Sequence, residues 1–148
     1  MANQILAASI LMAVAGAMIA SQAPINAALG RSVGSPIAAA TLSFGVGFVI
    51  LLVVSVLIGN GPNLLRVTRV PMWMLAGGAL GAVYVFAALW SVPKLGVLTT
   101  TTLMIFGQMG AALLLDHIGA FGVAQQSVSP TRLLSAALVA GGVILSRW

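Results

Sequence analysis

The chain has 148 residues, of which 61% are hydrophobic and 5% are charged, and its formal net charge is +5 at pH 7. Soluble domains carry about 25% charged residues, so this composition excludes a water-soluble globular protein and indicates an integral membrane protein. The six cationic residues stand singly beside apolar runs, which is typical of anchors at membrane ends and not of a nucleic-acid-binding surface. The absence of cysteine excludes disulfides and thiolate metal sites.

The apolar runs are long enough for five membrane-spanning helices, because about 20 apolar residues cross the hydrocarbon core. No Lys or Arg precedes residue 31, so the first run lacks the positive start of a secretory signal, and we expect it to be retained as a helix. We predict a single all-α transmembrane domain over residues 1–148, with spans at about 3–29, 36–59, 71–92, 97–115 and 131–147.

Short segments between the spans carry residues that favour turns. Residues 30–35 contain two glycines and two serines and are predicted to form a turn before Pro36, which suits the first position of a helix. Residues 60–63 are a cluster of helix breakers, and residues 93–96 are predicted to form a tight hairpin. The longest polar loop is expected between the fourth and fifth spans, up to Pro130.

The end of the first span carries two amides and a proline at a depth that should still lie inside the bilayer. A buried amide costs about 2–7 kcal/mol unless it is hydrogen-bonded, and Pro24 removes one helical hydrogen bond. Such groups persist at membrane depth mainly where they face protein or a water-filled cavity. Gln22 and Asn26 lie one turn apart on the same helix face. We therefore predict that they line a polar cavity, and that Pro24 provides a backbone break at which the helix bends.

Other spans place polar side chains in a layer near the same membrane face. From a rise of 1.5 Å per residue, Ser43 lies roughly 10 Å deep, Tyr84 about 12 Å and Gln108 roughly 20 Å, and the threonines at 41 and 99–102 also lie near this layer. Hydroxyls often bond carbonyls of their own helix, and Tyr84 has aromatic packing near Trp90 as an alternative. We predict a substrate path lined by Gln22, Asn26, Ser43, Tyr84 and Gln108.

The only acidic residue, Asp116, lies at the end of the fourth span. Proton-driven cation exporters generally keep a carboxylate inside the membrane. Asp116 and His117 could form a proton-linked gate, but we favour an ion pair of Asp116 with Arg132, Arg66 or Arg69 that fixes the loop. One His and one Asp are too few for a metal site, and no nucleophile, base and orienting group form a catalytic set. We therefore expect no metal, no cofactor and no enzyme activity.

Five spans place the two termini on opposite sides of the membrane. The cations then divide equally between the N-terminal side and the other side, with Arg66, Arg69 and Arg132 against Arg31, Lys94 and Arg147. Since a Lys/Arg bias normally fixes orientation, we expect this chain to insert both ways. Dual insertion predicts an antiparallel, inverted-topology homodimer of ten helices, with a two-fold axis in the membrane plane. The alternative is a partner subunit that sets one orientation.

Glycine is frequent inside the predicted spans, with 17 glycines in the chain. Gly77 and Gly81 form a Gly-x-x-x-Gly pair, which lets helix backbones approach closely in lipid. We interpret this pair as a helix-packing surface within the subunit, or alternatively as a dimer seam.

Several motifs together resemble one membrane-protein family: residues 22–30 (QAPINAALG), residues 40–44 (ATLSF), Gly77-Gly78 with Gly81, Gly107-Gln108, and residues 113–117 (LLLDH). The resemblance is to the YdcZ-like family of inner-membrane exporters, within the drug/metabolite transporter superfamily, and it covers nearly the whole chain. It implies five helices per subunit, a multi-pass location in the bacterial inner membrane, and function as an antiparallel pair, either alone or with a paralogous subunit. The family is distantly similar to small multidrug resistance exporters, whose membrane glutamate has no counterpart in the first span here.

These observations predict a small membrane transporter that exports a small organic solute by alternating access as a dual-topology dimer. The expected partners are the solute, the lipid bilayer and a second subunit. Two alternatives remain open. In one, the chain is a non-transporting membrane scaffold or assembly subunit whose amides hold helices together. In the other, it is a passive channel.

Overall fold

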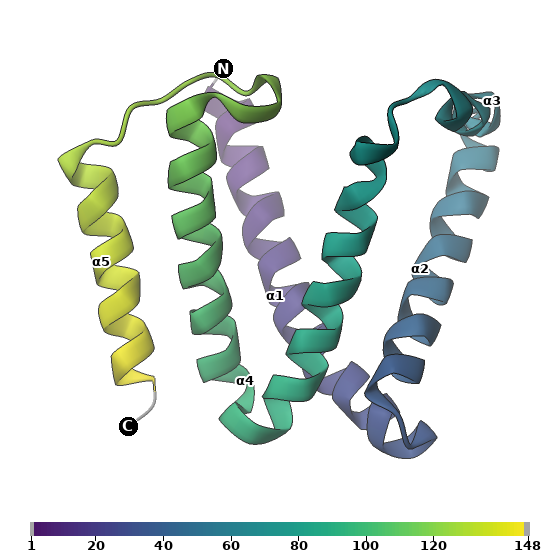
Figure 1. Cartoon of the computed structure of the whole chain (residues 1–148), viewed down its shortest axis with the longest axis horizontal. Helices are drawn as coiled ribbons and strands as arrows, with labels where there is room; N and C mark the ends of the chain where they lie inside the picture. The colour runs from purple at the N-terminus through teal and green to yellow at the C-terminus, as the bar shows by residue number, and fades with distance from the viewer. Residues whose placement is uncertain (1, 147–148) are drawn as a thin grey trace. The chain divides into compact units, whose positions relative to one another are not determined.

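The computed structural model describes residues 2–146, so Arg147 of the charge count lies outside the described residues. Every regular element in this range is helical, which confirms the all-α prediction. The elements are α1 (Ala2–Val33), α2 (Pro36–Leu57), α3 (Gly61–Leu64), η1 (Leu65–Arg69), η2 (Met72–Leu75), α4 (Ala76–Ile118), η3 (Ala120–Gly122) and α5 (Pro130–Leu145) (Figure 1).

Helix α4 is divided by a break at Gly96. The backbone of Gly96 has φ 79° and ψ 167°, a conformation that glycine adopts readily and other residues do not. The break separates a first arm (residues 76–95) from a second arm (residues 97–118), so five long helices occupy the five predicted spans. The hairpin predicted over residues 93–96 is wrong in extent, because the helix continues through Pro93 and only Gly96 leaves the helical conformation. The boundary between two compact units, Met1–Lys94 and Leu95–Trp148, lies at this break.

Three long helical stretches of the described chain have the length and apolar composition needed to cross a membrane. Asn3–Val33, Pro36–Leu57 and Met72–Ile118, which includes both arms, meet both criteria, and Pro130–Leu145 is a shorter apolar helix. The third predicted span begins later than expected, because residues 72–75 form the 3₁₀-helix η2 before α4 starts at Ala76. The connector that precedes it, η1, carries Arg66 and Arg69.

The turn predicted over residues 30–35 is too long, because α1 stays helical to Val33 and only Gly34 and Ser35 connect it to α2. Gly34 alone takes a positive φ, 74°, and the Ser35 N–H donates to the Gly30 carbonyl at 3.0 Å. A glycine at this position with that hydrogen bond is a Schellman ending. The Ser35 hydroxyl then accepts from the Ala38 N–H at 3.2 Å, and Pro36 occupies the first turn of α2 as predicted. Two helices are thus joined by a minimal connection.

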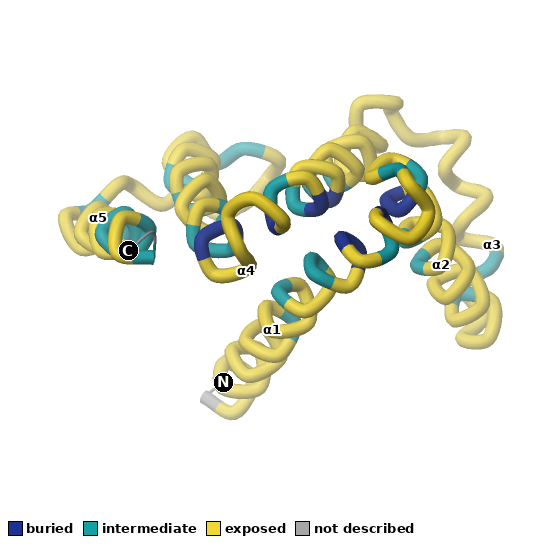
Figure 2. The backbone as a smooth tube through the Cα atoms, turned by 90° about the horizontal axis from the view of Figure 1, so that it is seen from below, coloured by how far each residue is buried: buried dark blue, intermediate teal, exposed yellow. Residues whose placement is uncertain are grey.

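The first unit contains α1, α2 and the first arm of α4. The end of α1, the start of α2 and the end of the first arm lie together at one end of this unit (Figure 1). Its core is the cluster Ala39, Ala40, Val85 and Leu89, with Leu29 and Tyr84 packed against it. The buried positions of this unit are concentrated there, whereas most of the remaining helix surface is exposed (Figure 2). The core therefore lies beside the polar end of α1.

The second unit contains the second arm of α4 and α5, which run antiparallel (Figure 1). The Thr99 hydroxyl donates to the Ser146 carbonyl at 2.8 Å, and the hydroxyls of Thr102 and Ser146 lie 3.1 Å apart. These contacts join the start of the second arm to the end of α5. At the other end of this unit, the Ser129 hydroxyl caps α5 by accepting from the Arg132 N–H at 3.3 Å.

Candidate functional site

A pocket between α1 and the first arm of α4 brings together three of the five predicted path residues: Gln22, Asn26 and Tyr84. The α1 side of the pocket comes from residues 19, 22, 23 and 26, which recur at the spacing of one helix face. The α4 side comes from residues 84, 85, 88 and 89, which also share one face. Helical periodicity therefore accounts for the two amides and the phenol facing one pocket. Apolar side chains such as Ile19 and Leu89 form its walls.

Asn26 is the most deeply placed polar side chain of this pocket, with 6% of its surface exposed. Across residues 2–146, no group hydrogen-bonds its side-chain amide. Every fully enclosed side-chain nitrogen or oxygen among these residues has a hydrogen-bond partner. The Asn26 amide has none, so its oxygen and nitrogen must be partly accessible. Because leaving a buried amide without a partner costs about 1–3 kcal/mol, the Asn26 amide is available to a molecule that enters the pocket.

Gln22 and Tyr84 extend this polar surface. The Gln22 side chain is exposed and the Tyr84 side chain is half-buried. In the described part of the chain, neither makes a side-chain hydrogen bond or ion pair. The pocket thus offers one phenol hydroxyl, which can both donate and accept a hydrogen bond. It also offers two amides, each of which has donor and acceptor atoms. It contains no carboxylate, because the only acidic side chain of the sequence lies elsewhere, at Asp116.

The other two predicted path residues lie outside this pocket. Ser43 is half-buried on α2 and is not among the lining residues. Gln108 belongs to the second arm, in the other unit, where its side chain is exposed. Pro24 is half-buried, and α1 remains helical through it. The proline nevertheless leaves the Ala20 carbonyl without its helical donor.

The two glycines of the Gly-x-x-x-Gly pair have different surroundings. A Cβ built on Gly81 would lie 3.6 Å from the ring of Phe44, so Gly81 packs against α2 within the first unit. A Cβ built on Gly77 would meet no described atom within 4 Å. Gly77 therefore leaves open space beside the first arm.

Most threonine hydroxyls of the predicted polar layer bond carbonyls. Thr41 donates to Ile37 of its own helix at 3.0 Å, and Thr100 donates to the Gly96 carbonyl at 2.7 Å. Thr102 bonds the Leu98 carbonyl at 2.9 Å. These hydroxyls bond carbonyls of their own helix, which was the alternative to lining a substrate path. The contact of Thr99 with Ser146 was not foreseen, because the sequence gives no register between the second arm and α5.

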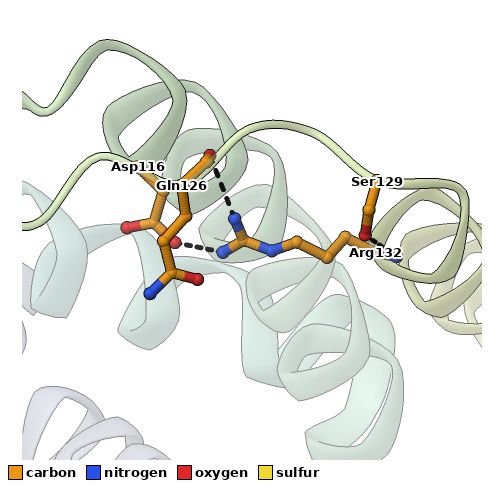
Figure 3. Close-up of polar contacts among 4 residues, drawn as sticks. All are labelled: Asp116, Gln126, Ser129 and Arg132. Carbon is orange, nitrogen blue, oxygen red and sulfur yellow. Dashed lines mark hydrogen bonds and ion pairs between the residues drawn. The ribbon is translucent and has the colours of Figure 1, made fainter.

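Asp116 forms an ion pair with Arg132, one of its three predicted partners (Figure 3). Arg132 Nη2 donates to Asp116 Oδ2, and Nη1 donates to the Gln126 carbonyl at 3.3 Å. The Gln126 N–H donates back to the Asp116 carbonyl at 2.8 Å. These contacts tie the loop before α5 to the end of α4.

The side chain of His117 is exposed and joins no contact of this network among the described residues. Its backbone carbonyl accepts a hydrogen bond from Gln125 Nε2 at 2.7 Å. His117 thus contributes its backbone to the loop, while the charged pair is formed by Asp116 and Arg132.

Long apolar helices with cations at their ends define a multi-pass membrane protein, and a polar pocket between two of them is typical of a transporter. The family model described as "Putative inner membrane exporter, YdcZ" matches residues 7–145. The chain therefore belongs to this family, and it is a transporter of the inner membrane. No curated protein and no solved structure matches the chain.

Proposed function

We propose that this transporter exports a small organic solute by alternating access, and that the solute binds in the pocket of Gln22, Asn26 and Tyr84. The observation that carries the proposal is the Asn26 side chain, which is 6% exposed, lines the pocket and has no hydrogen-bonding partner among the described residues. An amide held in this way at membrane depth is stabilised only when water or a solute bonds it. Binding sites of small molecules also combine apolar walls with a few polar groups. The volume of this pocket is about 10 Å³, which admits about one water molecule, so alternating access has to widen it before a solute binds.

We further propose that the working unit is an antiparallel dimer. In the first unit, Arg31 and Lys94 lie near the end where α1 and the first arm finish, and Arg66 and Arg69 lie in the connector at the opposite end (Figure 1). This balance supports insertion in both orientations. The open space beside Gly77 supports close approach of a second copy there. An inverted copy would present a second pocket toward the opposite membrane face, so that the two could open in turn.

Uptake of a panel of labelled solutes into proteoliposomes tests the proposal, with Gln22→Leu and Asn26→Leu as the decisive variants. Each removes an amide that the solute would bond, so we expect uptake to fall about tenfold or more, from one or two lost hydrogen bonds. Ser21→Ala is the matched control. Ser21 neighbours Gln22, but its hydroxyl bonds the Ala17 carbonyl of its own helix at 2.9 Å, so uptake should be unchanged.

The same variants separate the competing functions. In the transporter, cross-linking should recover dimers of both variants at the wild-type yield. In a scaffold held together by these amides, the dimer would be lost. A passive channel would show flux that rises linearly with solute concentration and does not exchange labelled solute between the two sides. Wild-type uptake in both amide variants would refute the site.

A further inference from the structure

A second pocket lies one helical turn further along α1 and has a cationic residue in its lining. Ala27, Gly30 and Arg31 line it from α1, and Leu89 and Pro93 line it from the first arm. Leu89, which is 3% exposed, also belongs to the wall of the pocket of Gln22 and Asn26. The two pockets are therefore neighbours in the first unit with Leu89 lining both, and together they are called the groove.

The charge of Arg31 has no counter-ion in the described chain. The single acidic side chain of the sequence, Asp116, is paired with Arg132. The neighbouring cation, Lys94, lies over the ring of Trp90 and adds a second positive charge near this end of the unit. The mouth of the groove is therefore positive, and no carboxylate of the first unit can attract or bind a cationic solute there.

Arg31 can reach the pocket of Asn26 only through the length of its side chain. At a rise of 1.5 Å and 3.6 residues per turn, Arg31 lies about 7.5 Å along α1 from Asn26 and roughly 140° round the helix, whereas Gln22 lies on the opposite side of α1. The guanidinium group of arginine binds carboxylate, phosphate or sulfonate groups through paired hydrogen bonds. An anionic group held by Arg31 would leave the remainder of a small solute within reach of the Asn26 amide.

We propose that the solutes of this transporter carry an anionic group, which Arg31 binds, while Asn26 hydrogen-bonds the rest of the molecule. This inference rests on the proposed function. Leu89 lines both the anion-binding end and the amide end of the site. Organic cations, by contrast, meet an uncompensated arginine in the groove and find no carboxylate to replace their lost hydration.

The test compares two labelled probes with the same 2-hydroxyethyl group and opposite permanent charges, isethionate and choline. We expect wild-type proteoliposomes to take up isethionate saturably and at least about tenfold faster than choline. Arg31→Gln should lower isethionate uptake about tenfold, since a charge-assisted contact is lost. Arg31→Lys should restore part of it by keeping the charge. Arg69→Gln, at the connector of the first unit, is the control and should leave the preference unchanged.

The outcomes separate this inference from the function on which it rests. Saturable uptake that favours choline, or equal uptake of both probes, overturns the anionic substrate class but leaves the transporter standing. No saturable uptake of either probe overturns the inference, and no saturable uptake of any solute of the panel overturns the proposed function as well. The assay is repeated in phosphatidylcholine vesicles with and without phosphatidylglycerol. If the Arg31→Gln defect appears only with phosphatidylglycerol, Arg31 binds a lipid headgroup, and the inference is overturned.

Discussion

Replacing Asn26 by leucine should stabilise the protein while impairing transport. The two side chains have the same number of heavy atoms and the same branching, so the exchange mainly changes polarity. Asn26 is 6% exposed and has no partner for its amide among the described residues. Its polar atoms are not fully enclosed, so only part of the penalty of about 1–3 kcal/mol for a buried group without a partner applies to it. We therefore expect the free energy of unfolding of Asn26→Leu to rise, by less than about 1–3 kcal/mol.

The loss in transport can be estimated from the same residue. An asparagine amide offers both donor and acceptor atoms, and each net hydrogen bond contributes about 0.5–1.5 kcal/mol. Loss of two such bonds to the solute corresponds to about 5- to 140-fold weaker binding. Stability and activity should thus change in opposite directions, which is common where a binding site keeps an unfavourable polar group.

Unfolding by sodium dodecyl sulfate in mixed micelles, followed by tryptophan fluorescence, measures the stability change. Gln22→Leu serves as the comparison, because Gln22 is exposed and substitutions at exposed sites usually change stability by less than about 0.5 kcal/mol. Ser21→Ala controls for any change on α1. A loss of stability in Asn26→Leu would show that the amide holds the fold together, and the reasoning from its missing partner would be refuted.

Three further variants test the groove, the helix contact and the loop. Leu89→Ala should enlarge the space that the two pockets share, admit bulkier probes in uptake assays and lower the free energy of unfolding by about 2–5 kcal/mol; an unchanged size limit would count against Leu89 as a wall of the solute site. Gly30→Val should destabilise strongly, because a Cβ there already lies 3.4 Å from Leu89 Cδ2, whereas Gly16→Val, with no atom within 4 Å, should have little effect in the same unfolding assay. Asp116→Asn should weaken a partly exposed ion pair that contributes about 0.2–1 kcal/mol. Proteolysis of residues 119–129 should then be faster, while solute uptake stays at the wild-type rate. Equal cleavage rates in the variant and the wild type would contradict the role of the pair in holding this loop.

The number and approximate limits of the helices follow from the sequence, because membrane crossing sets a minimum length of apolar chain and breakers mark the gaps. The errors in the helix limits arise because glycine and proline occur both in turns and inside helices. Gly30 resembles a turn residue, but it lies inside α1, where a Cβ would lie at contact distance from Leu89 and Pro36. Only Gly34 has the positive φ of the turn. In a similar way, Pro93 remains within the helix and Gly96 makes the break.

The candidate site was partly predictable. The four-residue spacing of Gln22 and Asn26 places them on one face, and the rise per residue places Tyr84 at a similar depth. Sequence reasoning did not identify Leu89 or Arg31 as lining residues. Both membrane helices are apolar around most of their circumference, so periodicity does not show which side faces protein and which faces lipid. The ordinary signal for Arg31, a cation at a helix end, indicates only a membrane anchor.

The position of the break at Gly96 has a consequence for the membrane topology of the chain. If each of the five helices crosses the membrane, three crossings precede Gly96 and two follow it, and a pair of crossings returns to the face from which it started. A C-terminal tag then emerges on the side of Gly96 in either orientation of the chain. Shortening the chain at Gly96 should leave the new end on the same face as the original one. Glycosylation or protease-protection tags at the two positions would then report the same side of the membrane.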